Sequence, residues 1–526
     1  MTKDIKDARI AELEKQSQKQ QQQIRERDQR IEELEQQNKK QKQRNKELEQ
    51  QNEKQGQEIG KLRDKIKEKN RKLNTARVQT SRALKKKEVI EDVVEQGSST
   101  GTNRTIANHE YAERIIRLAL MLYVYAGCSY RSAVRAMEVF HYFLVPFLPD
   151  GKLINYTTIC TWVHKAGLDV LKHRPETFEG AYALVFDLSI TIGDQQMILA
   201  LGVPATPDGN PIEQADAIVV DMEARSSWPA EAVLDFANNA IRKMGRKPMY
   251  CVSDEGSNFK KALPQLGVPH HIDISHRFAT IIRHAFTESS TVDNTDFEQF
   301  NKAYGRTRRL ALTDCAYLMP PAIRSKGRFM NMFPITRWAT SMLDNWHKLN
   351  PSERYHFNFV NQYSSLVNEM DEITQCYRKM MKLCKHQGLS KETAMQCLQI
   401  CKPLSYGTPR QRSIYQDIHA YIAHEVSMLT EEQPTCHVSS DIIETMFSSL
   451  KRKLSCNHFD GITATCLVLP LRPDLSVLER ASAFNIKDRF ERTSIVDVKA
   501  WKKGNLPGGR TSLRRNTLNL NKVVNF

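Results

Sequence analysis

Three acidic residues in different local settings carry the most chemical information in this chain. Asp187 lies near the end of one apolar run, Asp254 directly follows another, and Glu444 lies in the first turn of an amphipathic stretch. A few carboxylates together with substrate phosphate suffice to bind Mg²⁺, which prefers oxygen ligands and keeps several waters. Two such ions about 3.5–4 Å apart can activate an attacking oxygen and stabilise a leaving one. The three residues therefore predict phosphodiester chemistry, provided that the fold brings them together.

Asp187 and Asp254 each have an ordinary structural alternative. Asp187 could cap a local turn with Ser189, and Asp254 could be a turn residue ahead of a glycine. In the second case the neighbouring Glu255 would be the metal ligand. Both alternatives stay open in the sequence, because a turn uses the same carboxylate oxygens that a metal would.

Glu444 lies in a stretch whose apolar residues predict a helix that packs on the core. Its capping alternative is a D-x-x-E capping box with Asp441, and Asp441 could also be the ligand itself. Lys451 lies seven residues after Glu444, on the same side of this helix, where it is a candidate DNA contact. The apolar stripe, with i, i+4, i+7 and i+11 spacing, consists of Ile443, Phe447, Leu450 and Leu454.

The elements that must position these residues begin near residue 181, where helical patterns give way to short apolar runs. Such runs, bounded by turn residues, predict strands, and longer amphipathic stretches predict helices. The order is strand, strand, strand, helix, strand, helix, strand. The expected strands are Ala183–Leu188, Met197–Val203, Ala217–Val220, Tyr250–Ser253 and His271–Ile274, and the expected helices run from Trp228 to about Met244 and from Asn258 to Leu263.

Several short motifs resemble those of bacterial insertion-sequence DDE transposases, and their order along the chain strengthens the resemblance. They are Ser253–Asn258, Ser440–Glu444 and the basic run Lys451–Lys453. Asp273 and His276 resemble the (C/D)xxH element of several transposase groups, and Arg337-Trp338 resembles an element of their inserted helical region. The resemblance covers roughly residues 105–480.

The resemblance implies an α/β, RNase H-like catalytic core with a helical insertion. It also implies that Asp187, Asp254 and Glu444 are the catalytic metal ligands, with Asp187 bridging two Mg²⁺ ions and Mn²⁺ as a substitute. The implied reaction is DNA cleavage at transposon ends by water, followed by strand transfer from the exposed 3′-hydroxyl. Asp273 and His276 are candidate accessory residues, and His276 either orients a group at the metal site or is a satisfied core histidine.

A helix-turn-helix-like, DNA-binding α domain is expected before the core. A first helix is predicted at 112–125, a second begins at Ser129 and a third covers 155–165. An ordinary small helical domain has the same spacing, so the recognition-helix interpretation depends on which side chains face outward. The candidates left free to face a DNA groove are Thr157, Thr158, Thr161 and Lys165.

The first part of the chain is almost entirely polar, with sparse apolar residues at a 3.5-residue period. This period predicts a coiled coil, with a partly disordered polar tail as the alternative. Asn38, Asn45 and Asn52 occupy successive a positions, where an asparagine can bond its counterpart across a parallel dimer. We therefore expect a parallel homodimer.

These patterns divide the chain into parts of different composition. We expect a coiled coil at 1–92, a linker at 93–108, the helix-turn-helix-like domain at 109–175, the first part of the core at 181–280, the helical insertion at 281–436, the C-terminal helix of the core with Glu444 at 437–480, and a basic tail at 481–526.

Composition limits the partners and the compartment. The 526 residues carry a formal net charge of +16, which favours a polyanionic partner, with nucleic acid first. The chain shows neither an apolar signal region nor an apolar run near the roughly 18 residues that a membrane span needs, so we expect a cytoplasmic, nucleoid-associated protein without a membrane partner. The eleven cysteines show no zinc spacing and are expected to be reduced core thiols. Two competing functions are an inactive, transposase-derived DNA-binding protein and an RNase H-like nuclease without strand transfer.

Overall fold

The computed structural model describes residues 106, 109–140, 154–192, 194–206, 209, 211–288, 293–310, 314–323, 331–453 and 461–508, together with Lys15, Lys19 and Gln22, which are helical. The chain divides into two units, Met1–Asp92 and Val93–Phe526, and the second contains the sheet and the helices that pack on it. Apart from those three helical residues, the predicted coiled coil lies outside the described residues. So do most of the predicted linker and the chain after Gly508.

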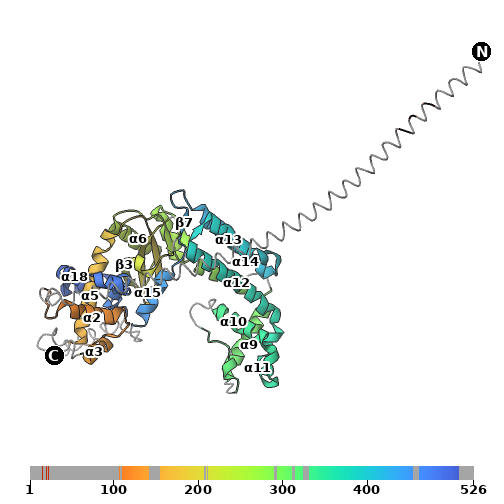
Figure 1. The fold of residues 1–526 in the computed structure, drawn as a ribbon, viewed down its shortest axis with the longest axis horizontal. Coiled ribbons are helices and arrows are strands. Elements are labelled where there is room, and N and C mark those ends of the chain that lie inside the picture. The colour runs from red at the N-terminus through yellow and green to blue at the C-terminus, as the bar shows by residue number, and fades with distance from the viewer. Residues whose placement is uncertain are drawn as a thin grey trace, which may run out of the picture. The chain divides into compact units, whose positions relative to one another are not determined.

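A five-stranded mixed sheet forms the centre of this unit (Figure 1). The strand order is β3-β2-β1-β4-β5; β1 pairs with β2 and β2 with β3 in antiparallel fashion, whereas β1 with β4 and β4 with β5 are parallel. The strands are β1 Tyr182–Ile192, β2 Gln195–Pro204, β3 Ile218–Arg225, β4 Cys251–Ser253 and β5 His270–Ile272.

The predicted α/β class and the predicted order of elements are confirmed. The two intervening helices are α6 Ala230–Met244 and α7 Ser257–Ala262. The first three strands are longer than predicted by up to five residues at one end, because their polar end residues still pair in the antiparallel ladder. Apolar runs mark only the part of a strand that is covered on both faces.

The sheet is covered by helices on both faces, and β1 contributes to a separate core on each. Side chains alternate along a strand, so Tyr182, Leu184 and Phe186 face the core under α6 and α7. Ala183 and Val185 face the opposite core, which also holds the apolar stripe of α15 Asp441–Lys451. The helix α15 packs against β1 on that face.

The chain between β5 and α15 is largely helical, as expected. The pair β6 Leu389–Ser390 and β7 Thr435–Cys436 joins two points of this segment in a short antiparallel ladder. Its helices are α8 Ile274–Arg283, α9 Thr295–Arg309, α10 Met332–Asp344, α11 Pro351–Gln362, α12 Ser364–Gln387, α13 Lys391–Cys401 and α14 Pro409–Ser427.

In the described part of the second unit, the α-helices before the sheet are α2 Glu113–Val124, α3 Tyr130–Val139 and α5 Tyr156–His173. Ser129 caps α3 as predicted, because its Oγ accepts the Ser132 backbone N–H at 3.1 Å. However, α5 is longer than predicted and most of it is buried. A Cβ added at Gly167 would lie 1.9 Å from the carbonyl oxygen of Leu467, so α5 touches the C-terminal part of the chain backbone to backbone.

The basic tail predicted from residue 481 is wrong for its first part. This stretch forms α18 Ile486–Arg492 and α19 Ile495–Asn505, both of which pack against α5. Ile486, Phe490 and Val498 are buried there, so these apolar residues outweigh the basic composition on which the prediction depended.

None of the helices in the described part of the chain is long and apolar enough to cross a membrane. The cysteines among the described residues are all free thiols, and most are buried, as expected for core residues.

Candidate active site

Asp187 lies on β1, and Asp254 directly follows β4, the parallel neighbour of β1. Leu184 of β1 pairs with Cys251 of β4, and Val185 pairs with Val252. Continuing this register for two residues along both strands brings Asp187 beside Asp254. Asp187 shares the parity of Val185, so alternation directs it to the face of the sheet that α15 covers.

The surroundings of Asp187 have further features of a functional position. Its side chain is buried, whereas most aspartates in folded proteins are exposed. The ladder between β1 and β2 also shifts register between Asp187 and Ile190. Such bulges occur preferentially next to active sites, where they change the direction of a side chain. Nothing is described of the Ser189 side chain, so the turn-capping alternative lies outside the described residues.

Asp254 follows β4 in a turn, as its alternative predicted. Its Oδ1 accepts the Gly256 backbone N–H at 3.0 Å, which holds the carboxylate at the strand end. The neighbouring Glu255 is bound by two cations, with Lys260 Nζ at 2.9 Å and Arg277 Nη1 at 2.8 Å from its Oε1. Glu255 therefore already has a structural role, which disfavours it as the metal ligand in place of Asp254.

Glu444 does not form the capping box that its sequence allows. The N-cap of α15 is Ser440, and no side chain caps this helix end. Asp441 instead forms an ion pair with Lys385 of α12. Ile443, Phe447 and Leu450 are buried as predicted, while Leu454 lies outside the described residues.

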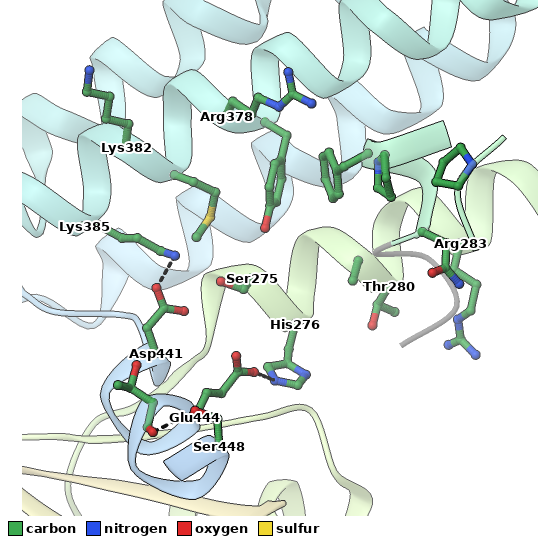
Figure 2. A pocket seen from close by; sticks show the side chains of 18 of the residues that line it. Ser275, His276, Thr280, Arg283, Arg378, Lys382, Lys385, Asp441, Glu444 and Ser448 are labelled. Atoms are coloured by element: carbon green, nitrogen blue, oxygen red, sulfur yellow. Dashed lines mark hydrogen bonds and ion pairs between the residues drawn. The ribbon is translucent and has the colours of Figure 1, made fainter. Parts of the chain in front are cut away.

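The Glu444 side chain is about half exposed and points to His276, whose Nε2 lies 3.5 Å from Glu444 Oε1 (Figure 2). His276 is not a core histidine, because 40% of its side chain is exposed. The hydrogen bond with Glu444, reinforced by the charges of Asp273 and Asp254, raises the pKa of His276 to about 9. The same hydrogen bond lowers the pKa of Glu444. Asp254, Asp273 and Glu444, which come from three separate parts of the chain, therefore all raise the pKa of the same imidazole.

Asp273 connects the two helices that carry His276 and Glu444. It is fully buried, and its Oδ1 caps α8 by accepting the His276 backbone N–H at 2.8 Å. Its Oδ2 accepts the backbone N–H of Ser440 at 2.5 Å and the Ser440 hydroxyl at 2.8 Å. Burial raises the pKa of Asp273, although these bonds oppose the shift. Asp273 is therefore a positioning residue that holds the start of α8 against the start of α15.

The three carboxylates suit a hard cation by their donor chemistry, since each offers oxygen ligands only. The sheet register directs Asp187 and Asp254 to one end of the two central strands, and α15 covers the same face. Among the described residues, no three His, Cys, Asp or Glu side chains gather closely enough to hold a metal ion. Metal binding by Asp187, Asp254 and Glu444 is accordingly a proposal.

A cleft of about 1220 Å³ opens beside Glu444 (Figure 2). Its walls come from α8, α10, α12 and α15, and its acidic residues, Asp441 and Glu444, both belong to α15. Four basic residues also line it, namely Arg283, Arg378, Lys382 and Lys385. Sequence reasoning missed the three on α12, although their i, i+4, i+7 spacing marks one face of a helix.

The predicted groove-facing residues of α5 differ in their exposure. Thr157 is exposed, and Thr158 and Thr161 are half-buried. Lys165 is buried, with Nζ 3.0 Å from His109 Nε2 and 3.3 Å from the carbonyl oxygen of Phe490, so the prediction that it is free to face DNA is wrong. The reason is α18, which covers this part of α5.

In the basic run at the end of α15, Lys451 is exposed, as a DNA contact requires. Lys453 has a structural role instead. Its ammonium donates to the carbonyl oxygens of Tyr123, at 2.6 Å, and Cys128, at 3.0 Å, near the C-terminal end of α2. This placement agrees with the preference of cations for helix C-termini.

The RW motif also has its two residues in different environments. Arg337 is exposed on α10. Trp338 is half-buried among aromatic side chains, and its Nε1–H donates to the Leu318 carbonyl oxygen at 2.9 Å.

Comparison with known proteins finds no family model that matches the chain and no curated protein that is significantly similar to it.

Proposed function

We propose that the protein is a DDE transposase with an RNase H-like core, which cleaves DNA at the ends of a mobile element and joins those ends to target DNA. The observation that carries this proposal is the arrangement of Asp187, Asp254 and α15. Asp187 lies on β1 and Asp254 directly follows β4, its parallel neighbour in a mixed sheet ordered β3-β2-β1-β4-β5. The helix with Glu444 packs against β1 on the face to which Asp187 is directed.

In this proposal Asp187, Asp254 and Glu444 hold Mg²⁺ or Mn²⁺. When bound, two such ions activate an attacking oxygen and stabilise a leaving one. The chain keeps its ligands in place through a second set of groups: the Gly256 N–H holds Asp254, and Asp273 ties α15 to α8. Groups that orient metal ligands in this way typically contribute about 10–100-fold in metal affinity or activity.

Charge supports DNA as the substrate. The net charge is +16, and the cleft beside Glu444 contains more cationic than anionic side chains. The exposed Thr157 and Lys451 remain candidate DNA contacts, and the homodimer through the N-terminal coiled coil remains part of the proposal. Such a dimer would pair two DNA ends in one assembly.

The first prediction is that Asp187→Asn, Asp254→Asn and Glu444→Gln each abolish metal-dependent DNA cleavage. The loss should exceed the roughly 10–100-fold typical of groups that only support a ligand. The measurement uses the full-length protein, Mg²⁺ or Mn²⁺, and DNA with the ends of the flanking element. Products of cleavage and of strand transfer are separated on a denaturing gel.

Glu255→Gln and Asp441→Asn are the matched controls for that experiment, because each neutralises a carboxylate near the site whose observed partners are cationic side chains. Both controls should keep most of the activity. Metal-dependent cleavage that survives all three test substitutions would refute the assignment. Cleavage without any joined product would instead identify a nuclease.

A further inference from the structure

One face of α12 presents a row of cations to the cleft. Arg378, Lys382 and Lys385 follow one another at helical spacing, and all three line the cleft opposite α8 (Figure 2). Arg378 and Lys382 are exposed, whereas Lys385 is half-buried in its ion pair with Asp441. We call these three residues the α12 stripe. The stripe therefore ends at α15, next to the turn that carries Glu444.

The cleft has little anionic charge to neutralise the stripe. Its acidic lining residues are Asp441 and Glu444, and each already faces a cation, Lys385 and His276 respectively. Among the described residues that line the cleft, no acidic side chain forms an ion pair with Arg378 or Lys382. Arg283 adds a further cation from α8, on the opposite wall. The exposed side chains of Arg378 and Lys382, which have no observed carboxylate partner in the cleft, favour an anionic ligand.

The length of the stripe suits a nucleic-acid backbone. Seven residues of helix span about 10 Å at 1.5 Å per residue. One strand of duplex DNA carries a phosphate about every 3.4 Å along the helix axis, so the stripe covers about three phosphates. An arginine and two lysines that contact phosphates position the duplex without reading its sequence.

We infer that the α12 stripe binds the phosphate backbone of the DNA strand that leads to the carboxylates, and that it does so independently of sequence. This inference rests on the proposed function, because it takes the scissile phosphate to lie at Asp187, Asp254 and Glu444. The stripe then sets the direction in which the strand enters the site. It is a positioning surface, whereas the carboxylates carry out the chemistry.

The test compares two charge-matched double variants of the full-length protein. Arg378→Gln/Lys382→Gln removes two cations from the stripe and leaves Lys385 in its contact with α15. Lys379→Gln/Lys391→Gln removes two exposed cations that do not line the cleft. Binding to a short duplex DNA of mixed sequence is measured by fluorescence anisotropy over a range of salt concentrations, with EDTA present to prevent cleavage.

The stripe variant should bind more weakly than the wild type, and its slope of log affinity against log salt should be shallower by about 2. Consequently the ratio of the wild-type DNA affinity to that of the stripe variant should fall about tenfold between about 50 and 200 mM salt. The control variant should keep the wild-type slope. The inference would be overturned if the stripe variant bound DNA as tightly as the wild type, or if both variants lost the same amount of DNA affinity.

Two further measurements keep this inference separate from the proposed function. The stripe variant could keep the full DNA affinity while the wild-type protein cleaves DNA. That result would refute DNA binding by the α12 stripe and leave the enzyme assignment intact. Weaker binding of poly-glutamate by the stripe variant, without weaker DNA binding, would identify an acidic protein as the partner and overturn the inference as well.

Discussion

At the scale of single residues, Asp273 shows how one buried carboxylate can organise a site that it does not enter. It accepts hydrogen bonds from the backbones of two helices, at His276 and at Ser440, and from the Ser440 hydroxyl. His276 and Glu444 lie in the first turns of those helices. The ion pair between His276 and Glu444 therefore depends on the buried carboxylate of Asp273.

We predict that Asp273→Asn destabilises the protein by about 1–3 kcal/mol, because the amide NH₂ would face backbone donors and leave at least one buried donor without an acceptor. The measurement is the shift of the unfolding midpoint in urea. Ser440→Ala is the control, since it removes only the hydroxyl bond and should cost about 0.5–1.5 kcal/mol. Equal effects of the two substitutions would contradict this account of Asp273.

At the scale of elements, α5 and α15 each owe their position to a close contact with another part of the chain. The helix α15 packs its apolar stripe against β1. The helix α5 lets the backbone at Leu467 approach through Gly167, where no side chain intervenes. Glycine at such a place permits two backbones to meet, although it normally weakens a helix.

We predict opposite effects of Gly→Ala in two helices. Gly167→Ala should destabilise the protein by about 1–3 kcal/mol, because the new methyl group overlaps the Leu467 carbonyl. Gly305→Ala in α9 should stabilise it by about 0.5–1 kcal/mol, because nothing lies within 4 Å of the new methyl group and alanine favours the helix. Thermal unfolding of both variants tests this, and stabilisation by Gly167→Ala would be inconsistent with the packing.

At the scale of the whole described unit, the C-terminal helices α18 and α19 pack against α5, which precedes the sheet. Asp169 of α5 is fully buried and binds Arg489 Nη1 at 3.1 Å and Arg492 Nη2 at 2.9 Å, while the Thr493 hydroxyl donates to it at 3.1 Å. One carboxylate thus joins α5 to α18 and to the residue that follows it. Removing a partner from such a buried set leaves charge without compensation.

We predict that Asp169→Ala costs about 3–5 kcal/mol and exposes α18 and α19 to limited proteolysis. Glu491→Ala removes an exposed carboxylate from α18 and should change stability by no more than about 0.5 kcal/mol. Chemical denaturation and the time course of proteolysis provide the readouts. A stable, protease-resistant Asp169→Ala variant would show that apolar packing alone holds the C-terminal helices.

Local sequence pattern was sufficient to predict much of the central sheet and of the helices that pack on it. Apolar runs predicted all the strands of the main sheet, the two intervening helices and the core-facing side of α15, because burial of a strand or helix face imposes its own period. The Asp273 cap also has a local signal, since an aspartate at a helix start accepts the N–H three residues on.

Only the tertiary structure decided on which face and at which end of the sheet these groups lie. The register of β1 against β4 brings Asp187 level with Asp254, and the packing of α15 on β1 brings Glu444 to the same face; both depend on contacts between residues far apart in the chain. The burial of Lys165 and the α12 stripe are likewise set by long-range packing. Charge and hydropathy along a chain describe each residue with its neighbours in sequence, whereas exposure and ion pairing depend on neighbours in space.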